Sequence, residues 1–363
     1  MKRRIPILAL MLALVTLLCA CAAPSVPQKG NENTPANLQE GNNYKADMEN
    51  GNNTKSSNGR VWPWEDPSIT LPPFTGEVTE FGSIKSLKVL AVGDASARDA
   101  WYFFPQIAKE AGIEIKIAVL YAKGDLTTYQ NENTKYTHYE NTGDGWVTVS
   151  TEATKADVLQ SDAWDYFIVN QSIARSAKED SYDVLNDLLR TVKTALTAKN
   201  PQAKVLFMET WVYEANSRNN LFNGLRDFGD TWNEDNAPIQ ARMLEAHQKI
   251  TRSKVATCTS LSKIATNAKG DGVIPVGTAV HNMRGSYWTD GMTKDGEYLT
   301  VTGKTMAALM LFKSLTGYDI NGMELSDSVF DHARPHLGVI KESVNNAYLH
   351  PYEVSPSVYD TLD

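Results

Sequence analysis

The segment VLAVGDASARDAWYFF, residues 89–104, has the pattern of a buried strand, a tight turn and a helix. The apolar run over residues 87–93 predicts a strand that is covered on both faces. Gly93 and the three residues after it predict the turn, and a helix is expected from there to about Gly112. A strand that passes through a short turn into a helix is the repeating unit of an α/β fold.

The same alternation continues along the chain. Further strands are expected at 113–121, 164–171, 203–211 and 272–280, and helices at 181–196, 237–251 and 301–317, the last ending at Gly317. Residues 136–151 alternate about Gly143-Asp144-Gly145, which predicts a hairpin. Apolar strands separated by helices require a sheet covered on both faces. The pattern therefore predicts a three-layer α/β/α domain over residues 84–320, with a central parallel five-stranded sheet and a hairpin insertion.

The composition argues against a nucleic-acid partner. The 363 residues carry a net charge of −8, and their Lys and Arg form no basic stripe. A nucleic-acid surface needs clustered positive charge. With 42% hydrophobic and 21% charged residues, the chain has the composition of a globular protein with a large core.

The N-terminus has the features of an export signal. Basic residues at positions 2–4 precede an apolar run over residues 7–18, which is the order found in secretory signals. The run ends in Leu18-Cys19-Ala20-Cys21, which fits a bacterial lipobox. We therefore expect residues 1–23 to be a lipoprotein signal peptide, with Cys21 as the lipidated residue.

Two alternatives for this segment are an uncleaved membrane anchor and a plain cleaved signal. The apolar run is short against the roughly 20 residues that cross a bilayer. All three interpretations place the folded part outside the cytoplasm. The expected location is extracytoplasmic, with the chain anchored to the bacterial cell membrane by its N-terminal lipid.

Three further segments flank the predicted domain. Residues 24–60 are rich in Asn and Gly and are expected to form a disordered tether, because they cannot bury enough apolar surface to order themselves. Residues 61–83 form a Trp- and Pro-rich arm, which either packs over the domain or presents Trp62 and Trp64 as a sugar-stacking surface. Residues 321–363 form a C-terminal extension. Cys258 is the one cysteine beyond the signal, so no internal disulfide is expected.

Polar residues gather where the predicted strands end, which is where ligands bind in parallel sheets. The chain reads AVGDASARDA after the first strand, YAKGDL after the second, VNQS after the third, and DGEYLTVTG before the last helix. In this order and content the chain resembles the SGNH (GDSL-like) hydrolase superfamily. It is similar to a subfamily of bacterial exported proteins whose first block reads G-N-S-F-S-x-D-A. The resemblance implies a flavodoxin-like fold and an ancestry in ester hydrolysis.

The resemblance also implies roles for single residues, and both reactive groups are substituted. Ala95 occupies the position of the nucleophilic serine, and Tyr298 occupies that of the histidine base, while Asp295 matches the aspartate that orients the base. Alanine has no atom that can attack a carbonyl, and a phenol with a pKa near 10 is a poor base at neutral pH. Ser96, one position later, is a substitute nucleophile, and His281 is a less direct candidate for the base.

At the positions that the resemblance implies for the oxyanion hole and its surroundings, this chain has the residue types of the superfamily. They are Gly93, Asp94, Gly124 and either Asn170 or Gln171, whose side chains point to opposite faces of a strand. Asp99 is expected to cap the first helix. Trp211, Tyr213 and Arg284 end strands and either line a polar cleft or serve packing alone.

Three functions are compatible with these residues. The first is a catalytically degenerate lipoprotein that binds a cell-surface glycan or another ligand at the former ester-hydrolysis cleft. The second is an active esterase or deacetylase on acylated carbohydrate that uses Ser96 or another nucleophile. The third is a structural envelope protein. No carboxylate cluster in the sequence offers a metal site, and His332, His336 and His350 lie in the tail beyond the last motif, so neither a metal nor a cofactor is expected.

Overall fold

The computed structural model describes residues 66, 68–220, 222, 224, 237–259 and 268–359. The predicted signal peptide with Cys21, the tether, and Trp62 and Trp64 lie outside these described residues. Among the helices that are described, none combines the length and the apolar character that crossing a bilayer requires.

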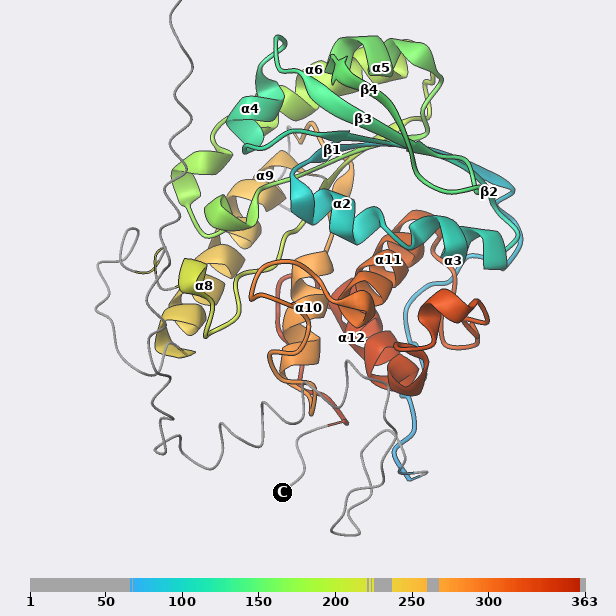
Figure 1. Ribbon diagram of the computed structural model, residues 1–363, viewed down its shortest axis with the longest axis vertical. Helices are drawn as coiled ribbons and strands as arrows, with labels where there is room; N and C mark the ends of the chain where they lie inside the picture. The colour runs from blue at the N-terminus through green and yellow to red at the C-terminus, as the bar shows by residue number, and fades with distance from the viewer. Residues whose placement is uncertain are drawn as a thin grey trace, which may run out of the picture. The chain divides into compact units, whose positions relative to one another are not determined.

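A seven-stranded sheet forms the centre of the fold (Figure 1). Its order is β4-β3-β2-β1-β5-β6-β7, and five neighbouring strands, β2 to β7 in that order, are parallel. The antiparallel hairpin β3–β4 extends the sheet beyond β2. The predicted parallel five-stranded sheet and its hairpin are confirmed. The strands are β1 (Ser86–Gly93), β2 (Glu114–Tyr121), β3 (Tyr136–Asn141), β4 (Val147–Ala153), β5 (Tyr166–Asn170), β6 (Lys204–Met208) and β7 (Gly272–Ile274).

The predicted fifth core strand over residues 272–280 is wrong in its second half. The strand ends at Ile274, and Pro275 caps helix α10 (Val276–Arg284). Proline lacks the N–H that would continue the ladder, and its fixed φ suits the start of a helix. α10 is buried on nearly every side, so its sequence shows a continuous apolar run in place of helical periodicity.

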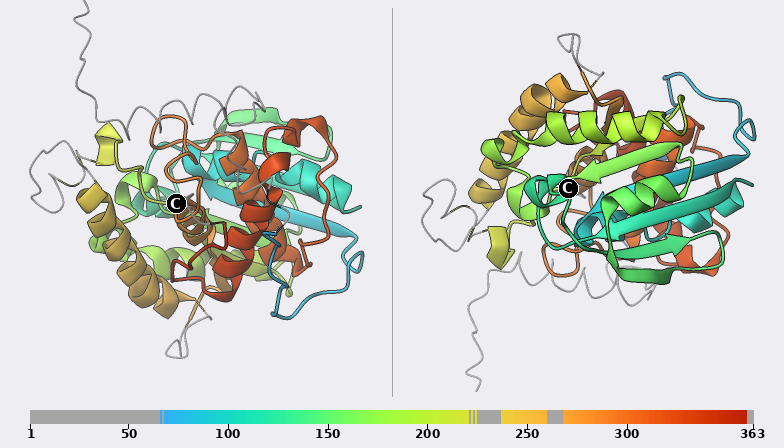
Figure 2. Two further views of the ribbon diagram at one scale, coloured as in Figure 1. Left: turned by 90° about the horizontal axis from the view of Figure 1, so that it is seen from below. Right: turned by 90° about the horizontal axis from the view of Figure 1, so that it is seen from above.

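One face of the sheet packs against α4 (Leu126–Gln130), α5 (Lys155–Ser161) and α6 (Leu185–Thr197). Leu90 and Val92 of the central strand point into this layer. α6 presents apolar residues at helical spacing to the same core: Leu185, Leu188, Leu189, Val192 and Leu196. Seen from above in Figure 2, α6 lies across the strands in yellow-green.

The opposite face is covered by α2 (Ala95–Trp101), α3 (Phe104–Glu110), α10, α11 (Val301–Thr316) and α12 (Leu337–Leu349) (Figures 1 and 2). The single helix expected up to Gly112 is divided into α2 and α3, with Pro105 in the first turn of the second. α11 ends where predicted, at Gly317, which has a φ of 71° and donates its N–H to Lys313 O.

The remaining elements lie mostly between β5 and β7 in sequence. They are short 3₁₀ turns at Ile173–Arg175, Glu179–Tyr182, Ser328–Phe330 and Arg334–His336, helix α8 (Ala237–Ile250), a π-helical turn at Thr251–Val255, and α9 (Ala256–Cys258). The described part of the arm packs on the domain: Phe74 contacts Tyr348, and Thr79 N donates to Gly317 O at 2.9 Å.

Candidate functional site

The turn after β1 lies at the carboxyl edge of the sheet and is organised by Asp94. This residue caps α2, because its Oδ1 accepts hydrogen bonds from Ser96 N at 3.0 Å and from Ser96 Oγ at 2.5 Å. The prediction that Asp99 caps this helix is wrong. Asp99 lies inside α2, where its Oδ2 accepts from Leu299 N at 3.0 Å and its Oδ1 is 3.1 Å from Lys304 Nζ.

The hydroxyl of Ser96 is buried and bonded on both sides. Its residue is 1% exposed, its Oγ donates to Asp94, and it accepts from Asn170 Nδ2 at 2.9 Å. Asn170 Nδ2 also donates to Gln171 O at 2.9 Å. A side-chain amide has two N–H donors. Both are therefore engaged within the protein, and neither is directed at a bound oxyanion.

The choice between Asn170 and Gln171 is decided by the tertiary structure. Asn170 faces the turn after β1, as its contact with Ser96 shows. Gln171 points elsewhere: its Nε2 donates to Ser181 O at 3.1 Å, and its Oε1 accepts from Ser172 N at 2.8 Å. Of the two candidates, only Asn170 belongs to the site.

Both glycines implied for the site lie where a side chain does not fit. A Cβ on Gly93 would lie 2.0 Å from Asn170 Oδ1 and 2.7 Å from Ala97 Cβ. A Cβ on Gly124 would lie 2.6 Å from Thr128 Cβ. Gly124 precedes the capping box of α4, and its carbonyl accepts from Tyr129 Oη at 3.0 Å. Close packing therefore accounts for glycine at both positions.

The two substituted positions lie on α2 and on the loop before α11. Ala95 is the first residue of α2 and presents a half-buried methyl group. Tyr298 is half-buried in the loop, and burial together with the charges of Glu297 and Asp94 raises the pKa of its phenol. Asp295 is exposed, and its Oδ1 accepts from the backbone N of Glu297 and Tyr298, so it shapes its own turn and orients no base.

Two carboxyl groups at this edge retain protons more strongly than usual. Burial raises the pKa of Asp94, although hydrogen bonds from Ser96 oppose the shift. Burial and the charges of Asp295 and Asp94 raise the pKa of Glu297, whose Oε2 accepts from Asn219 Nδ2 at 2.8 Å. Glu297 was not among the predicted site residues, and its signal in the sequence is its position beside Tyr298.

In the part of the chain that the structure describes, no imidazole contacts Ser96. His281, the candidate base, is 4% exposed; its Nε2 accepts from Val212 N at 3.4 Å, and its Nδ1 lies 3.2 Å from Arg284 Nη1. Burial and the charges of Arg284 and His247 hold its pKa well below the usual range. A neutral, enclosed ring with these partners is a structural residue.

Comparisons with known proteins assign the family. Residues 88–329 match the family described as "Domain of unknown function (DUF4886)". The chain belongs to the DUF4886 family. A crystal structure of a DUF4886 protein from Bacteroides uniformis ATCC 8492 shares the fold, with a TM-score of 0.62 and 23% identity over 75% of this chain and 98% of that one.

A peptidoglycan O-acetylesterase matches 64% of this chain and 91% of its own, at 11% identity and a TM-score of 0.29, which is too low to show a common fold. None of the curated proteins compared with the chain matches it. The resemblance of this DUF4886 chain to the SGNH superfamily therefore stays a prediction.

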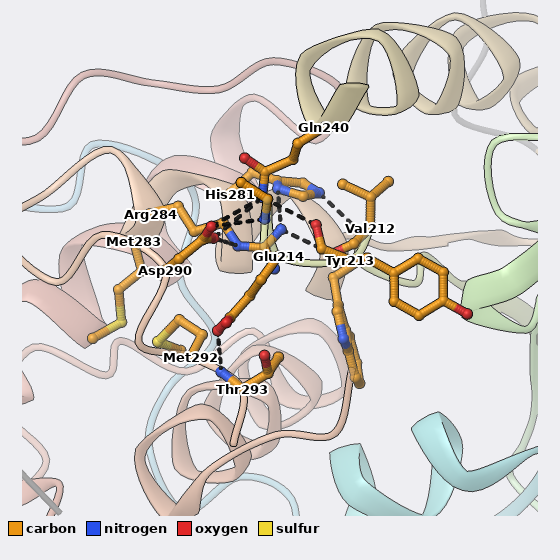
Figure 3. A network of polar contacts seen from close by, with 12 residues as sticks. Val212, Tyr213, Glu214, Gln240, His281, Met283, Arg284, Asp290, Met292 and Thr293 are labelled. Carbon is orange, nitrogen blue, oxygen red and sulfur yellow. Dashed lines mark hydrogen bonds and ion pairs between the residues drawn. The ribbon is translucent and has the colours of Figure 1, made fainter. Parts of the chain in front are cut away.

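A second polar cluster of the DUF4886 domain lies at the end of β6 (Figure 3). Arg284 is its centre: Nε lies 3.0 Å from Asp290 Oδ1, and Nη1 donates to Val212 O at 2.9 Å. Glu214 Oε1 accepts from Thr293 N at 3.1 Å. These contacts join the loop after β6 to α10 and to the loop before α11.

Of the two roles left open for Trp211, Tyr213 and Arg284, a polar cleft or packing, their burial favours packing. Trp211 is fully buried and donates Nε1 to Glu297 O at 2.9 Å, and Tyr213 is 2% exposed. The Arg284 side chain is 9% exposed and held by protein partners. These residues pack the loops that carry the site and do not face a ligand.

Deeper in the DUF4886 domain, a buried charge pair fastens β6 to α8 and α10. Glu209 follows β6 directly and lies 3.2 Å from His247 Nε2, with both side chains 1% exposed. Its Oε2 accepts from Thr278 N and Oγ1, both at 2.8 Å. Although burial opposes it, contact with Glu209 and Ser176 O raises the pKa of His247. A charged residue directly after an apolar strand is the sequence signal for this pair.

Across the residues that the structure describes, no group of three or more His, Cys, Asp or Glu side chains is placed to hold a metal ion. The candidate site at the carboxyl edge thus consists of the bonded group Asp94, Ser96 and Asn170 beside Ala95, with Glu297 and Tyr298 close enough for the charge of Asp94 to act on them.

Proposed function

We propose that this chain is an exported, lipid-anchored member of the DUF4886 family that binds a saccharide at the carboxyl edge of its sheet and does not hydrolyse esters there. The proposal depends mainly on the side chains in the turn after β1. The residue at the position implied for a nucleophile is Ala95, which has only a methyl group, and the neighbouring Ser96 is 1% exposed.

The chemistry of the neighbouring groups supports the absence of acyl transfer. Nucleophilic catalysis needs a hydroxyl within reach of both a base and the substrate carbonyl. Ser96 Oγ is enclosed between Asp94 and Asn170, and the amide of Asn170 has no N–H left for an oxyanion. This turn therefore has no accessible hydroxyl to attack an acyl carbonyl, and no N–H of Asn170 to stabilise the oxyanion that such an attack would form.

The same edge has what a hydroxyl-rich neutral ligand requires. The carboxyl groups of Asp94 and Glu297 accept hydrogen bonds, and the phenol of Tyr298, whose pKa is raised, both donates and accepts them. A few directed polar groups beside aromatic rings are typical of small-ligand sites. The predicted lipid anchor and tether would hold the site near cell-surface glycans.

The test is hydrolysis by the chain without its predicted signal peptide. We expect no turnover of p-nitrophenyl acetate or acetylated xylan above that of the Ser96→Ala variant. Binding of neutral oligosaccharides should raise the melting temperature of the protein, because a ligand of the native state stabilises it. Turnover that disappears in Ser96→Ala would overturn the proposal.

One specific contact favours a second candidate, an esterase with a Ser96–Asp94 dyad. Ser96 Oγ donates to Asp94 Oδ1, which is the contact that a nucleophile makes with a carboxylate base. This function requires the turn to open and expose Ser96. It predicts that Ser96→Ala and Asp94→Asn each abolish hydrolysis, and that activity rises with pH as the Asp94 carboxyl ionises.

A further inference from the structure

A groove of about 560 Å³ lies beside the candidate site, on the face of the sheet covered by α2 and α3. Its walls come from α2 and α3 on one side, and from β3 and the β3–β4 loop on the other. Lys304 of α11 also lines the groove. Its volume falls within the range of pockets that hold small organic ligands.

Aromatic rings from segments far apart in sequence form the walls. Tyr102, Phe103, Tyr139 and Trp146 all line the groove, and Tyr102 is 45% exposed. Trp146 Nε1 donates to Tyr102 O at 3.1 Å, which fastens the hairpin loop across the end of α2. Lys304 Nζ lies over the Tyr102 ring, 4.7 Å from its centre. The C–H face of a sugar ring can pack against aromatic rings that line a groove in this way.

One charged group in the groove has no ion-pair partner among the described residues. Arg98 is exposed and makes no ion pair with a described carboxylate; its guanidinium lies 5.5 Å from the centre of the Tyr121 ring. The other cation, Lys304, is neutralised by Asp99 at 3.1 Å. The groove therefore offers one positive charge without an ion-pair partner among the described residues, in a chain whose net charge is −8.

We propose that this groove binds a saccharide that carries a carboxylate, such as a uronic acid. The sugar ring packs against Tyr102 and Trp146, and the carboxylate pairs with Arg98. A guanidinium matches a carboxylate through two parallel N–H···O bonds, which makes Arg98 the selective element. The proposal takes only its ligand class, a saccharide, from the proposed function.

Arg98 also relates the groove to the candidate site. Tyr121, over which it lies, ends β2 at the carboxyl edge of the sheet. Tyr121 and Asp94 both lie close enough to Tyr298 to raise the pKa of its phenol. Arg98 therefore lies next to the carboxyl edge of the sheet.

The test is calorimetric binding of trigalacturonic acid and of its methyl ester to the chain without its signal peptide. We expect the acid to bind more tightly than the ester. Arg98→Gln should weaken binding of the acid about tenfold, the size of one lost charge-assisted contact, and leave the ester unchanged. Tyr102→Ala should weaken binding of both ligands, because stacking does not depend on charge.

Matched controls separate the groove from general effects. Arg190→Gln makes the same charge change on α6, on the other face of the sheet, and Val149→Ala truncates an exposed residue of the same hairpin. Neither should alter binding. Equal affinity for acid and ester, or loss of binding in either control, would overturn the role of Arg98 and the groove.

The binding measurements distinguish an error in the groove proposal from an error in the proposed function. If Tyr298→Ala abolishes binding while Arg98→Gln and Tyr102→Ala have no effect, the saccharide binds at the carboxyl edge and the groove proposal is overturned. If only the groove variants weaken binding, the carboxyl-edge site is overturned and the groove stands. If neither ligand binds, the groove proposal falls.

Discussion

The turns after β1 and after β6 lie at the same edge of one sheet, and each begins with a carboxylate directly after a buried strand. Asp94 after β1 is half-buried and lies near the half-buried Glu297 and Tyr298. Glu209 after β6 is fully buried, paired with His247 and bonded by Thr278. The first turn leaves polar groups near solvent, whereas the second uses them to hold the fold together. Position at a strand end alone therefore does not make a residue functional.

The largest expected effect comes from breaking the β6 turn. Glu209→Ala removes one partner of a buried pair and leaves His247 without its carboxylate. We expect the free energy of unfolding to fall by about 3 kcal/mol, because the buried donors of Thr278 are left without their acceptor and the side chain's volume is lost. Urea denaturation measures it, with the exposed pair Asp187–Arg190 as the control: Asp187→Ala should leave stability nearly unchanged. Equal losses in the two variants would contradict the comparison.

A smaller loss is expected from filling the space beneath the β1 turn. Gly93→Ala places a Cβ 2.7 Å from Ala97 Cβ and displaces Asn170. Overpacking of this kind costs about 2 kcal/mol. Gly322→Ala is the control, because nothing lies within 4 Å of its added Cβ. Should both variants unfold at the same urea concentration, the close approach of Asn170 to Gly93 would be wrong.

The β6 turn should also respond to pH through His281. Its pKa is depressed in the folded state, so below pH 6.5 the unfolded chain binds the proton more strongly. The wild type should therefore lose stability relative to His281→Gln as pH falls, by up to about 1.4 kcal/mol for each pH unit below 6.5. Melting temperatures between pH 7.5 and 5 measure the difference. The exposed His332→Gln variant should track the wild type.

The smallest expected effect is at the hydroxyl of Ser96. Ser96→Ala removes a donor to Asp94 and an acceptor of Asn170, and should lower the free energy of unfolding by about 1 kcal/mol. Ser314 provides the contrast, because its hydroxyl is buried without a hydrogen-bond partner among the described residues. Ser314→Ala should be neutral or stabilising. A larger loss of stability in Ser314→Ala than in Ser96→Ala would show that the hydrogen bonds of the Ser96 hydroxyl to Asp94 and Asn170 are wrong.

Much of the fold could be read from local patterns. The apolar runs that became β1, β2, β5 and β6 were found because a strand covered on both faces is apolar at every position. The same rule failed at residues 276–280, because a helix enclosed on all sides is also apolar at every position. The break between α2 and α3 was missed as well, since it falls within one apolar stretch.

The candidate site was predicted less completely than the fold. Residues next to one another in the chain, such as Gly93, Asp94, Ala95 and Ser96, were found together because one turn carries them. The aromatic residues Trp211 and Tyr213 were placed at the correct edge, but whether they are buried depends on the loops that pack over them. Glu297 and the Glu209–His247 pair were missed, because their partners are distant in sequence.

The sequence by itself determined the succession of strands and helices and the absence of a hydroxyl at residue 95, since hydrophobic periodicity and side-chain chemistry are local properties. Only the tertiary structure decided that Ser96 is enclosed, that Asn170 and not Gln171 faces it, and that Trp146 lies against Tyr102 to form a groove. The physical reason is that burial and hydrogen-bond partners depend on which distant segments pack side by side, and packing is settled by the whole chain at once.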